Sequence, residues 1–383
     1  MDFGWTDEQL ELKAAVIDFA RQTLNDDFEA REKRGEFSRE LWEECARFGI
    51  QGMPVPEEFG GSAHSVLTTA LVMEALGYSC LDQGLLFSLH AQMWAVQAPL
   101  LRFGSEEQKR RYLPGLCDGS IVGAHGMSEP GSGSDAFALS TRAEARGDRF
   151  VLNGSKTFVT NAPVADLFLV FATVNKKKGM WGITAFLVDR DTKGLSTGSP
   201  LQKMGLTTSP TSEVFFEDCE IPAENMLGRA GGGAQLFNHS MAWERSCILG
   251  SVVGSMQREL ELCVEHAKTR EQFGKPIGNF QLVAAKLADM KLRMETARLL
   301  FYQAAWAHDQ GESNALEGAM AKLLISEASV QSSLDAIQIH GGYGYMRETQ
   351  VERHLRDNLG SRLYSGTSEI QRLIVARHLG LAP

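Results

Sequence analysis

The chain lacks any apolar segment long enough to cross a bilayer, and its first ten residues are acidic where a signal peptide would be basic. It also lacks CxxC pairs and the close histidine spacings of metal sites, so its six cysteines are expected to be reduced thiols. An excess of basic residues is missing too, and the net charge of −10 argues against nucleic acid as a partner. We therefore expect a cytoplasmic protein without a metal ion, which binds neither membranes nor nucleic acid.

Internal repeats, low-complexity tracts and blocks of like charge are absent as well, which argues against solenoid and disordered architectures. The composition is that of an ordinary globular protein, with 43% hydrophobic and 22% charged residues. Since 383 residues exceed what one hydrophobic core usually supports, two or three domains are expected.

Hydrophobic periodicity divides the chain into three parts. Residues 1–119 predict an N-terminal helical domain. Residues 120–228 are rich in β-branched and aromatic residues and predict a central β domain. Residues 229–383 predict long helices with the apolar stripes of a four-helix bundle. The expected fold class is α+β, with the β domain between two helical ones.

Local signals predict several boundaries inside these domains. Thr6 and Gln9 form a capping box ahead of the first helix. The dipeptide Asn153-Gly154 is expected to be the turn of a hairpin, because it favours the positive φ that such turns require. Pro114 is expected to end a short helix that begins after Ser105. The remaining predictions are long helices over 234–267, 281–310 and 313–339, shorter ones over 346–357 and 367–379, and a loop over 270–278.

One charged residue lies on a predicted helix face that is otherwise apolar or small. Within 234–267, the neighbours of Glu244 at one turn include Ser240, Cys247 and Ile248. Burial raises the pKa of a carboxylate and makes it a better proton acceptor, as a general base for a carbon acid requires. Glu244 is therefore a candidate catalytic base, the alternative being a surface glutamate outside any site.

Four short motifs could contribute to a binding site, although none decides a function alone. The loop 127–135, MSEPGSGSD, presents amides and hydroxyls that can hydrogen-bond a flat polar ring, or it is only a connector. Residues 158–160 put an aromatic face beside a hydroxyl. Two glycines in 338–344, QIHGGYG, are typical of a helix end, and 366–369, GTSE, begins the last helix with an exposed N-terminus.

The order of these motifs resembles the acyl-CoA dehydrogenase flavoprotein family over almost the whole chain. The segments that carry the resemblance are MSEPGSGSD, NGSKTFVTN, REQFGKPIGNFQ, QIHGGYGY and SGTSEIQRLIVAR. The resemblance implies an N-terminal α domain, a central β domain and a C-terminal four-helix bundle, with FAD between the β domain and the bundle. It also implies a homotetramer built from dimers.

The resemblance assigns the binding residues one by one. Met127 and Ser128 resemble the positions that bond the flavin edge, and Ser134 the one that contacts the pantetheine arm of the thioester. Phe158 stands where the family usually has Trp beside the flavin, with Thr160 as its hydroxyl partner. The other implied cofactor contacts are Arg270, Phe273, Gln281, Gln338, Gly341 and Gly342, which reach the FAD of a neighbouring subunit, and Thr367 and Glu369, from the last helix.

The sequence departs from the family pattern at the catalytic base. Most members carry a glutamate immediately before the Gly of the C-terminal GT motif, where this chain has Ser365, whose hydroxyl is too weakly basic to take an α-proton. A minority, including isovaleryl-CoA dehydrogenases, carries the base in a segment of the form LERLVLAG, and here 243–250, WERSCILG, occupies that segment. The resemblance thus puts Glu244 at the base position, beside Arg245. The backbone amide of Ser365 is expected to bond the thioester carbonyl.

A narrower resemblance concerns the substrate. The segments SMAWERSC, AWAHDQGES and SRLYSGTSEIQ are similar to prolyl-carrier-protein dehydrogenases of pyrrole and pyrroline biosynthesis. They imply FAD-dependent oxidation of an L-prolyl thioester on a carrier protein to a pyrroline or pyrrole thioester. The electron acceptor implied is an electron-transfer flavoprotein or oxygen.

Three alternatives stay open from the sequence. One is a short- or branched-chain acyl-CoA dehydrogenase that uses Glu244, and a second is a flavin oxidase or monooxygenase of the same fold. The third is a homologue that binds flavin without turnover.

Overall fold

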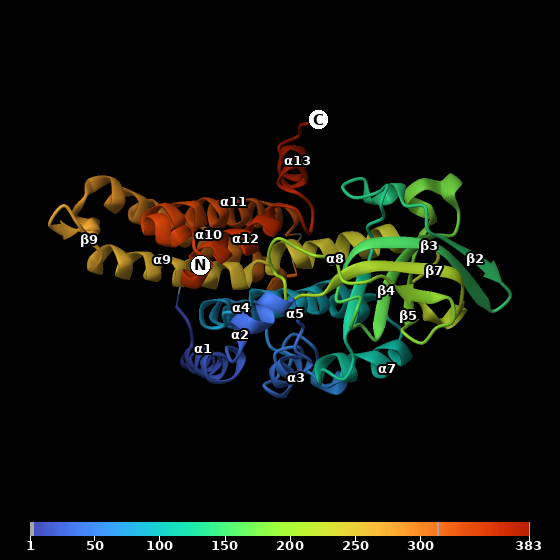
Figure 1. Ribbon diagram of the computed structural model, residues 1–383. Helices are drawn as coiled ribbons and strands as arrows, with labels where there is room; N and C mark the ends of the chain where they lie inside the picture. Colours follow the sequence, from blue (N-terminus) through green and yellow to red (C-terminus); the bar gives the residue numbers. More distant parts are fainter. Residues whose placement is uncertain (1–3, 312–313, 383) are drawn as a thin grey trace.

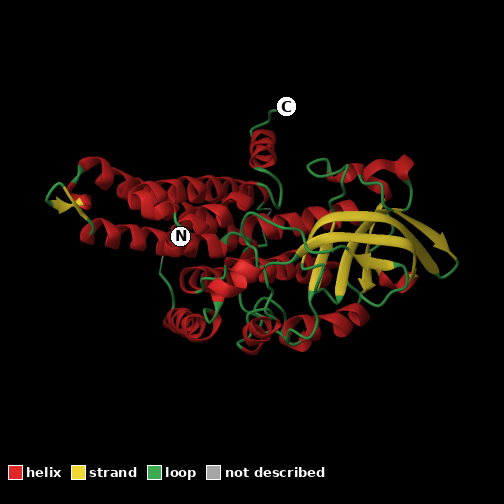
Figure 2. Ribbon diagram, viewed as in Figure 1, coloured by secondary structure: helices red, strands yellow, loops and turns green. Residues whose placement is uncertain are grey.

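The computed structural model describes residues 4–311 and 314–382. Helices form both ends of the chain and one large sheet forms its middle, as the colours of Figure 2 show. This arrangement confirms the predicted α+β class. In Figure 1 the sheet lies at one end of an elongated molecule, and the long helices extend to the other end.

The N-terminal segment folds into short helices that pack along the C-terminal ones (Figure 1). Their bounds are α1 Asp7–Phe19, η1 Ala20–Leu24, α2 Phe28–Arg34, α3 Arg39–Arg47, α4 Val66–Ser79, α5 Gln83–Gln92, η3 Met93–Gln97, α6 Ala98–Phe103 and α7 Glu106–Cys117. The capping box is confirmed, because the hydroxyl of Thr6 accepts from the amide of Gln9 at 3.2 Å and the Gln9 side chain accepts from the amide of Thr6 at 3.0 Å.

The prediction that Pro114 ends a helix is wrong. Pro114 lies inside α7, which continues to Cys117. A proline in a helix removes one backbone hydrogen bond, here the one to the carbonyl of Arg110, which is an exposed residue. The helix ends soon afterwards, so the interruption is small.

The central sheet has eight strands, in the order β6-β7-β3-β2-β4-β5-β8, with β1 paired in parallel to β4. Their bounds are β1 Gly123–Gly126, β2 Arg142–Arg146, β3 Arg149–Thr160, β4 Leu167–Thr173, β5 Ile183–Asp189, β6 Leu195–Thr197, β7 Thr211–Pro222 and β8 Met226–Leu227. Alternate residues of β4 enter two hydrophobic clusters, Leu169 and Phe171 on the α7 side, Phe168 and Val170 on the other. Both faces of the sheet are therefore covered at its centre.

The predicted hairpin turn at Asn153-Gly154 is wrong. β3 continues through the dipeptide, and the turn that joins β2 to β3 lies at residues 147–148. The dipeptide instead forms an irregularity in the pairing of β3 with β7, where Gly154 has φ 145°. The Asn153 side chain donates to the carboxylate of Asp218 at 3.2 Å and accepts from its amide at 3.0 Å. Pairing with a distant strand thus overrides the local turn preference.

The C-terminal segment contains the long helices. Their bounds are α8 Gly233–Cys247, α9 Gly250–Thr269, α10 Gln281–Asp309, α11 Ala315–His340, α12 Val351–Leu359 and α13 Ser368–His378. The predicted loop 270–278 is confirmed as non-helical through residue 276, where it holds the small hairpin of β9 (Glu271–Gln272) and β10 (Lys275–Pro276). The prediction is wrong for its last two residues, which begin the 3-10 helix η7 (Ile277–Asn279). The first residue of the predicted helix 313–339 lies outside the described residues.

The predicted continuous helix over 234–267 is interrupted. α8 ends at Cys247, and Leu249, with φ −94° and ψ 11°, precedes the start of α9 at Gly250. A Cβ on Gly250 would lie 2.7 Å from the ring of Phe301 in α10. The break between α8 and α9 therefore lies where α9 packs tightly against α10. Hydrophobic periodicity in the sequence does not reveal such a tertiary contact.

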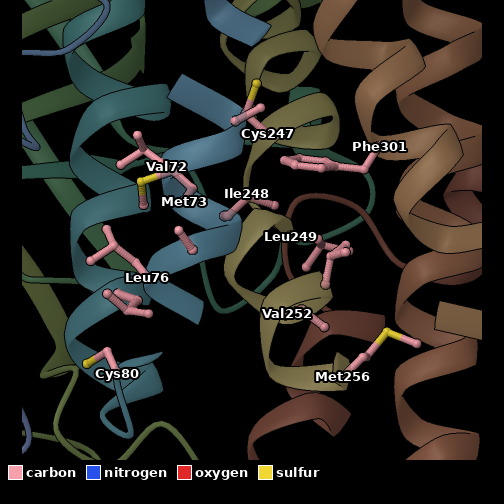
Figure 3. Close-up of a cluster of buried hydrophobic side chains, with 14 of the residues drawn as sticks. Val72, Met73, Leu76, Cys80, Cys247, Ile248, Leu249, Val252, Met256 and Phe301 are labelled. Carbon is pink, nitrogen blue, oxygen red and sulfur yellow. The ribbon is translucent and has the colours of Figure 1, made fainter. Parts of the chain in front are cut away.

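One hydrophobic cluster joins the N-terminal helices to the C-terminal ones. In Figure 3, side chains of α4 such as Leu76 face Ile248, which lies between α8 and α9, and side chains of those two helices. α4 and α9 approach closely, because a Cβ on Gly77 would lie 1.9 Å from the carbonyl oxygen of Ser251. This contact holds the junction of α8 and α9 against the N-terminal helices.

Within residues 4–311 and 314–382, no helix has the length and apolar character needed to cross a membrane. The predicted domain limits at 119/120 and 228/229 fall between α7 and β1 and between β8 and α8. They remain predictions.

Candidate active site

A cavity of about 530 Å³ lies where η3, β1, β3, α8 and the segment before α13 meet. Its volume lies within the range of about 300–1,000 Å³ that is usual for small-molecule sites. The predicted residues in its wall are Met127, Ser128, Ser134, Phe158, Thr160, Glu244, Arg245, Ser365 and Thr367. The structure thus brings together predicted site residues from the β domain and the C-terminal helices.

Glu244 lies in the last turns of α8, and it is only 7% exposed. Burial raises its pKa to about 7, although the hydrogen bond from Ser365 and the charges of Arg245 and Lys322 act in the opposite direction. The hydroxyl of Ser365 donates to Oε2 of Glu244. A carboxylate with this pKa is partly ionised at neutral pH and can accept a proton from a weak acid. The position therefore suits a general base.

Ser365 lies in a strained turn held by two buried side chains. Its φ is 55°, in the left-handed region that costs a non-glycine residue on the order of 1 kcal/mol, and Gly366 follows with φ 87°. Lys322 Nζ donates to the Gly366 carbonyl at 2.7 Å. Gln371 Nε2 donates to the Gly366 carbonyl at 2.7 Å and to that of Ser365 at 3.2 Å. These bonds hold the two carbonyls away from the cavity.

The backbone amide of Ser365 is left as an available donor. Within the described part of the chain, it makes no hydrogen bond. Since Ser365 lines the cavity, this amide can bond the oxygen of a ligand beside Glu244.

Arg245 adds a positive group to the same wall. Burial lowers its pKa, opposed by the charge of Glu244, and its Nε has no hydrogen-bond partner among the described residues. An unpartnered buried donor of this kind can bond a polar ligand atom.

The loop after β1 rests on a buried ion pair that the sequence did not reveal. Lys156 Nζ lies 2.8 Å from Glu129 Oε1 and donates to the carbonyl of Met127 at 3.1 Å. Glu129 also accepts from the amides of Ser140 and Thr141 at 2.6 and 3.0 Å. Burial alone would raise the pKa of Glu129, but the charge and the hydrogen bond of Lys156 lower this pKa to about 2. The sequence analysis assigned no role to either residue.

Phe158 is presented to the cavity by an irregular stretch of β3. The register against β7 shifts between Lys156 and Val159, and Phe158 has φ 55°. Its ring is 72% exposed, unusual for a phenylalanine in a strand, and it lines the cavity with Thr160. The backbone therefore turns an aromatic face toward the space where a flat ligand would lie.

His125 of β1 is a second cavity residue that the sequence interpretation missed. Its ring lies 5.2 Å from that of Phe171 and 6.2 Å from that of Phe237, between centroids. Burial lowers its pKa to about 4, so the ring is neutral at neutral pH, and Nε2 has no partner within the described residues. In the sequence, His125 is an isolated histidine that belongs to no recognisable motif, so no pattern pointed to it.

The remaining predicted cofactor contacts do not reach this cavity. Arg270, Phe273, Gln281, Gln338, Gly341 and Gly342 are exposed around the β9–β10 hairpin and the neighbouring ends of α10 and α11, at the opposite end of Figure 1 from the sheet. The Arg270 guanidinium lies 5.9 Å from the ring of Tyr343, and Phe273 is 94% exposed. The structure therefore places these six residues at one surface. Their contact with the FAD of a neighbouring subunit remains a prediction.

The last helix contributes to the cavity wall through its N-cap, Thr367, and through Ile370. Thr367 is the N-cap of α13, accepts from the amide of Ile370 at 3.4 Å and lines the cavity. Glu369 is exposed and is not part of the cavity wall. No group of three or more His, Cys, Asp or Glu side chains that could hold a metal occurs within 4–311 and 314–382.

Three domain families match the chain in order. Residues 6–120 match the family described as "Acyl-CoA dehydrogenase, N-terminal domain", residues 124–219 the corresponding middle domain, and residues 231–380 the C-terminal domain.

Individual relatives are similar over their full length. The chain is 43% identical over 381 residues to an L-prolyl-[peptidyl-carrier protein] dehydrogenase of Serratia sp. (strain ATCC 39006), covering 100% of this chain and 99% of the relative. The crystal structure of the prolyl acyl carrier protein oxidase AnaB is 47% identical, with TM-score 0.98 over 99% of this chain and 100% of that one. The structure titled "PigA with FAD and proline" is 43% identical, with TM-score 0.97 and full coverage of both chains.

Proposed function

The chain belongs to the acyl-CoA dehydrogenase family, and from this premise we propose that it oxidises an L-prolyl thioester carried by a carrier protein. The reaction is an FAD-dependent dehydrogenation that gives a pyrroline or pyrrole thioester. The observation that carries the proposal is the buried Glu244 at the cavity wall, bonded by Ser365 at the position where most of the family keeps its base.

The cavity fits the flavin of FAD. The segment around Met127 and Ser128 offers backbone groups and a hydroxyl, and the exposed ring of Phe158 offers a flat apolar face beside the hydroxyl of Thr160. The Lys156–Glu129 ion pair beneath this segment fixes the direction of the Met127 carbonyl. When bound, FAD supplies the two-electron oxidant that accepts a hydride from the substrate.

Glu244 removes the α-proton of the prolyl group. The thioester carbonyl makes that proton acidic, and a carboxylate with a pKa of about 7 is a strong enough base to compete for it while remaining partly ionised near neutral pH. Ser365 donates to Oε2 and so holds the carboxylate in one orientation. After proton transfer the base is a neutral carboxylic acid, the form that its buried setting favours.

The backbone amide of Ser365 bonds the thioester carbonyl oxygen. Negative charge grows on that oxygen as the α-proton leaves, and a fixed amide donor stabilises it without reorganisation. Lys322 and Gln371 hold the turn that aims this amide. The proposed base on α8 and the proposed donor on this turn therefore line the same cavity.

Of the two candidate substrates, we favour the prolyl thioester over a simple acyl-CoA. Full-length relatives at 43% to 47% identity are described as acting on prolyl groups of carrier proteins. The geometry of Glu244 alone is also compatible with a short- or branched-chain acyl-CoA, which is the second candidate.

We further propose a homotetramer in which the exposed set around Phe273 contacts the cofactor of a neighbouring subunit. The final electron acceptor in this proposal is an electron-transfer flavoprotein or oxygen.

The test is mass spectrometry of carrier-bound L-proline after incubation with the flavin-loaded protein. Loss of two or four hydrogens from the prolyl group, at a rate well above that with butyryl- or isovaleryl-CoA, is the expected result. Faster bleaching of the flavin by an acyl-CoA, with no change in the mass of the prolyl carrier, would favour the second candidate.

A further inference from the structure

The segment η5 (Lys176–Gly182) carries a positive patch on an acidic protein. Lys176, Lys177 and Lys178 are consecutive and exposed, whereas the whole chain has a net charge of −10. None of them takes part in the lysine ion pairs found in residues 4–311 and 314–382. No structural partner within the described chain therefore accounts for this charge.

The patch lies beside the mouth of the cavity. Gly133 and Ser134 both line the cavity and are exposed, so the cavity reaches the surface at their loop. The same loop continues into η4 (Ala136–Ala138), which packs against η5. Figure 1 shows these segments, teal-green and green, close together on the same side of the molecule as α13.

Apolar side chains extend the same patch. Trp181 is 66% exposed and Met180 is 37% exposed, and only Gly179 separates them from the lysines in the chain. A Cβ on Gly231 would lie 2.5 Å from the Trp181 carbonyl, so the end of η5 is braced by the segment that leads into α8. Tryptophan and methionine are enriched at surfaces that bind another protein.

We propose that η5 is the docking surface for an acidic carrier protein, whose thioester arm then enters the cavity at Ser134. The proposal rests on the proposed function, which requires a protein-bound substrate. The arm is joined to its carrier through a phosphodiester, so negative charge always lies at the base of the arm. Lysines at the cavity mouth complement that charge, while the acidic remainder of the enzyme disfavours docking elsewhere.

A charge-reversed enzyme tests the proposal. The variant is Lys177→Glu/Lys178→Glu, and its matched control is Lys13→Glu/Lys33→Glu, which makes the same charge change on α1 and α2, far below η5 in Figure 1. Two substrates are compared: L-prolyl-carrier protein, and L-prolyl-pantetheine, which lacks both the carrier and the phosphate. Steady-state kinetics are measured at low and at high salt.

The expected result is a KM for L-prolyl-carrier protein raised about tenfold or more, with kcat within about twofold of wild type. Turnover of L-prolyl-pantetheine is unchanged, and so are all parameters of the control. Salt raises the KM of the wild type for the carrier and has a smaller effect on the variant.

An unchanged KM for the carrier would overturn the proposal, and so would an equal loss with both substrates, since that indicates damage to the cavity. Calorimetric binding of holo carrier protein separates this failure from failure of the proposed function. In one outcome, the wild type binds the carrier, the variant binds it about tenfold more weakly, and neither oxidises the prolyl group. That outcome supports the docking surface and shows that the assigned reaction is wrong. If the wild type does not bind the carrier, the docking surface is wrong.

Discussion

The hydroxyl of Ser365 donates a hydrogen bond to the carboxylate of Glu244, across a sequence separation of 121 residues. The bond joins the position at which the family resemblance expects a base to Glu244, the residue that we propose as the base here. It also lowers the pKa of Glu244, against the larger effect of burial. In the proposed mechanism, Ser365 therefore positions Glu244 through its hydroxyl and bonds the substrate through its amide.

This relationship predicts a pH profile. Because the pKa of Glu244 is about 7, the rate of flavin reduction by substrate should fall as the pH drops below about 7, where the carboxyl becomes protonated. Replacing Ser365→Ala removes a bond to the ionised form, so the pKa of Glu244 rises further and the acidic limb moves to higher pH. At pH 6 we expect reduction about three- to tenfold slower than in the wild type, and at pH 9 a difference under about twofold.

The matched control is Ser240→Ala. Ser240 lies one turn before Glu244 on α8, and its buried hydroxyl has no partner within the described residues. Its profile should match that of the wild type, and an equal shift in both variants would mean that the Ser365 bond does not set the pKa.

The ion pair of Lys156 and Glu129 should support both stability and cofactor retention. Lys156→Met leaves a buried carboxylate without its counter-charge, which should lower the free energy of unfolding by about 3–5 kcal/mol at pH 7. The additional change Glu129→Gln should restore part of that loss. Chemical denaturation and the visible absorbance of retained FAD measure the two effects, and a single variant as stable as the wild type would refute this role.

The same pair predicts acid sensitivity. The pKa of Glu129 is lowered from 4.5 to about 2 in the folded state, so its contribution to stability is complete above about pH 4.5 and is lost as the pH falls toward 2.

Phe158 should support FAD through its ring rather than through a polar group. Phe158→Trp keeps a flat aromatic face and should retain FAD, whereas Phe158→Ala should retain clearly less after gel filtration. Leu10→Ala, at an exposed apolar residue of α1, is the control. Equal FAD content in Phe158→Ala and wild type would show that the ring does not contact the cofactor.

The close approach of α4 and α9 should tolerate no side chain at Gly77. A Cβ there would lie 1.9 Å from the carbonyl oxygen of Ser251, so Gly77→Ala should destabilise the fold by about 1–3 kcal/mol or more. Gly131→Ala serves as the control, because nothing lies within 4 Å of its Cβ position. Thermal unfolding distinguishes them, and similar melting temperatures would contradict the packing described for these helices.

Local signals in the sequence were sufficient for much of the fold. The capping box at Thr6 is encoded within four residues, and the change of period from helix to strand is visible over long windows. Glu244 could be identified because helical spacing alone gave its apolar neighbours, and Ser365 because it breaks a family pattern. The bond between them could not be predicted, since it depends on how α8 packs against the turn before α13.

Other features depend on distant parts of the chain and were missed for that reason. The Asn153-Gly154 dipeptide favours a turn, but pairing with β7 keeps it in a strand. The sequence analysis assigned no role to Lys156, because its partner Glu129 lies 27 residues away and only the fold places the two side chains together. The exposed set around Phe273 does not line the 530 Å³ cavity of its own chain, so its predicted contact with the FAD of a neighbouring subunit could be tested only in an assembly.

The central claim is that Glu244 is the base, and single-turnover reduction of bound flavin by L-prolyl-carrier protein tests it most directly. Glu244→Gln keeps the size and hydrogen-bonding capacity of the side chain but cannot take the proton. The control is Glu259→Gln, which removes another buried carboxyl of raised pKa, about 8, outside the cavity wall. Reduction should be about 10²- to 10⁴-fold slower in Glu244→Gln and within about twofold of wild type in the control. Unimpaired reduction in Glu244→Gln would contradict the account.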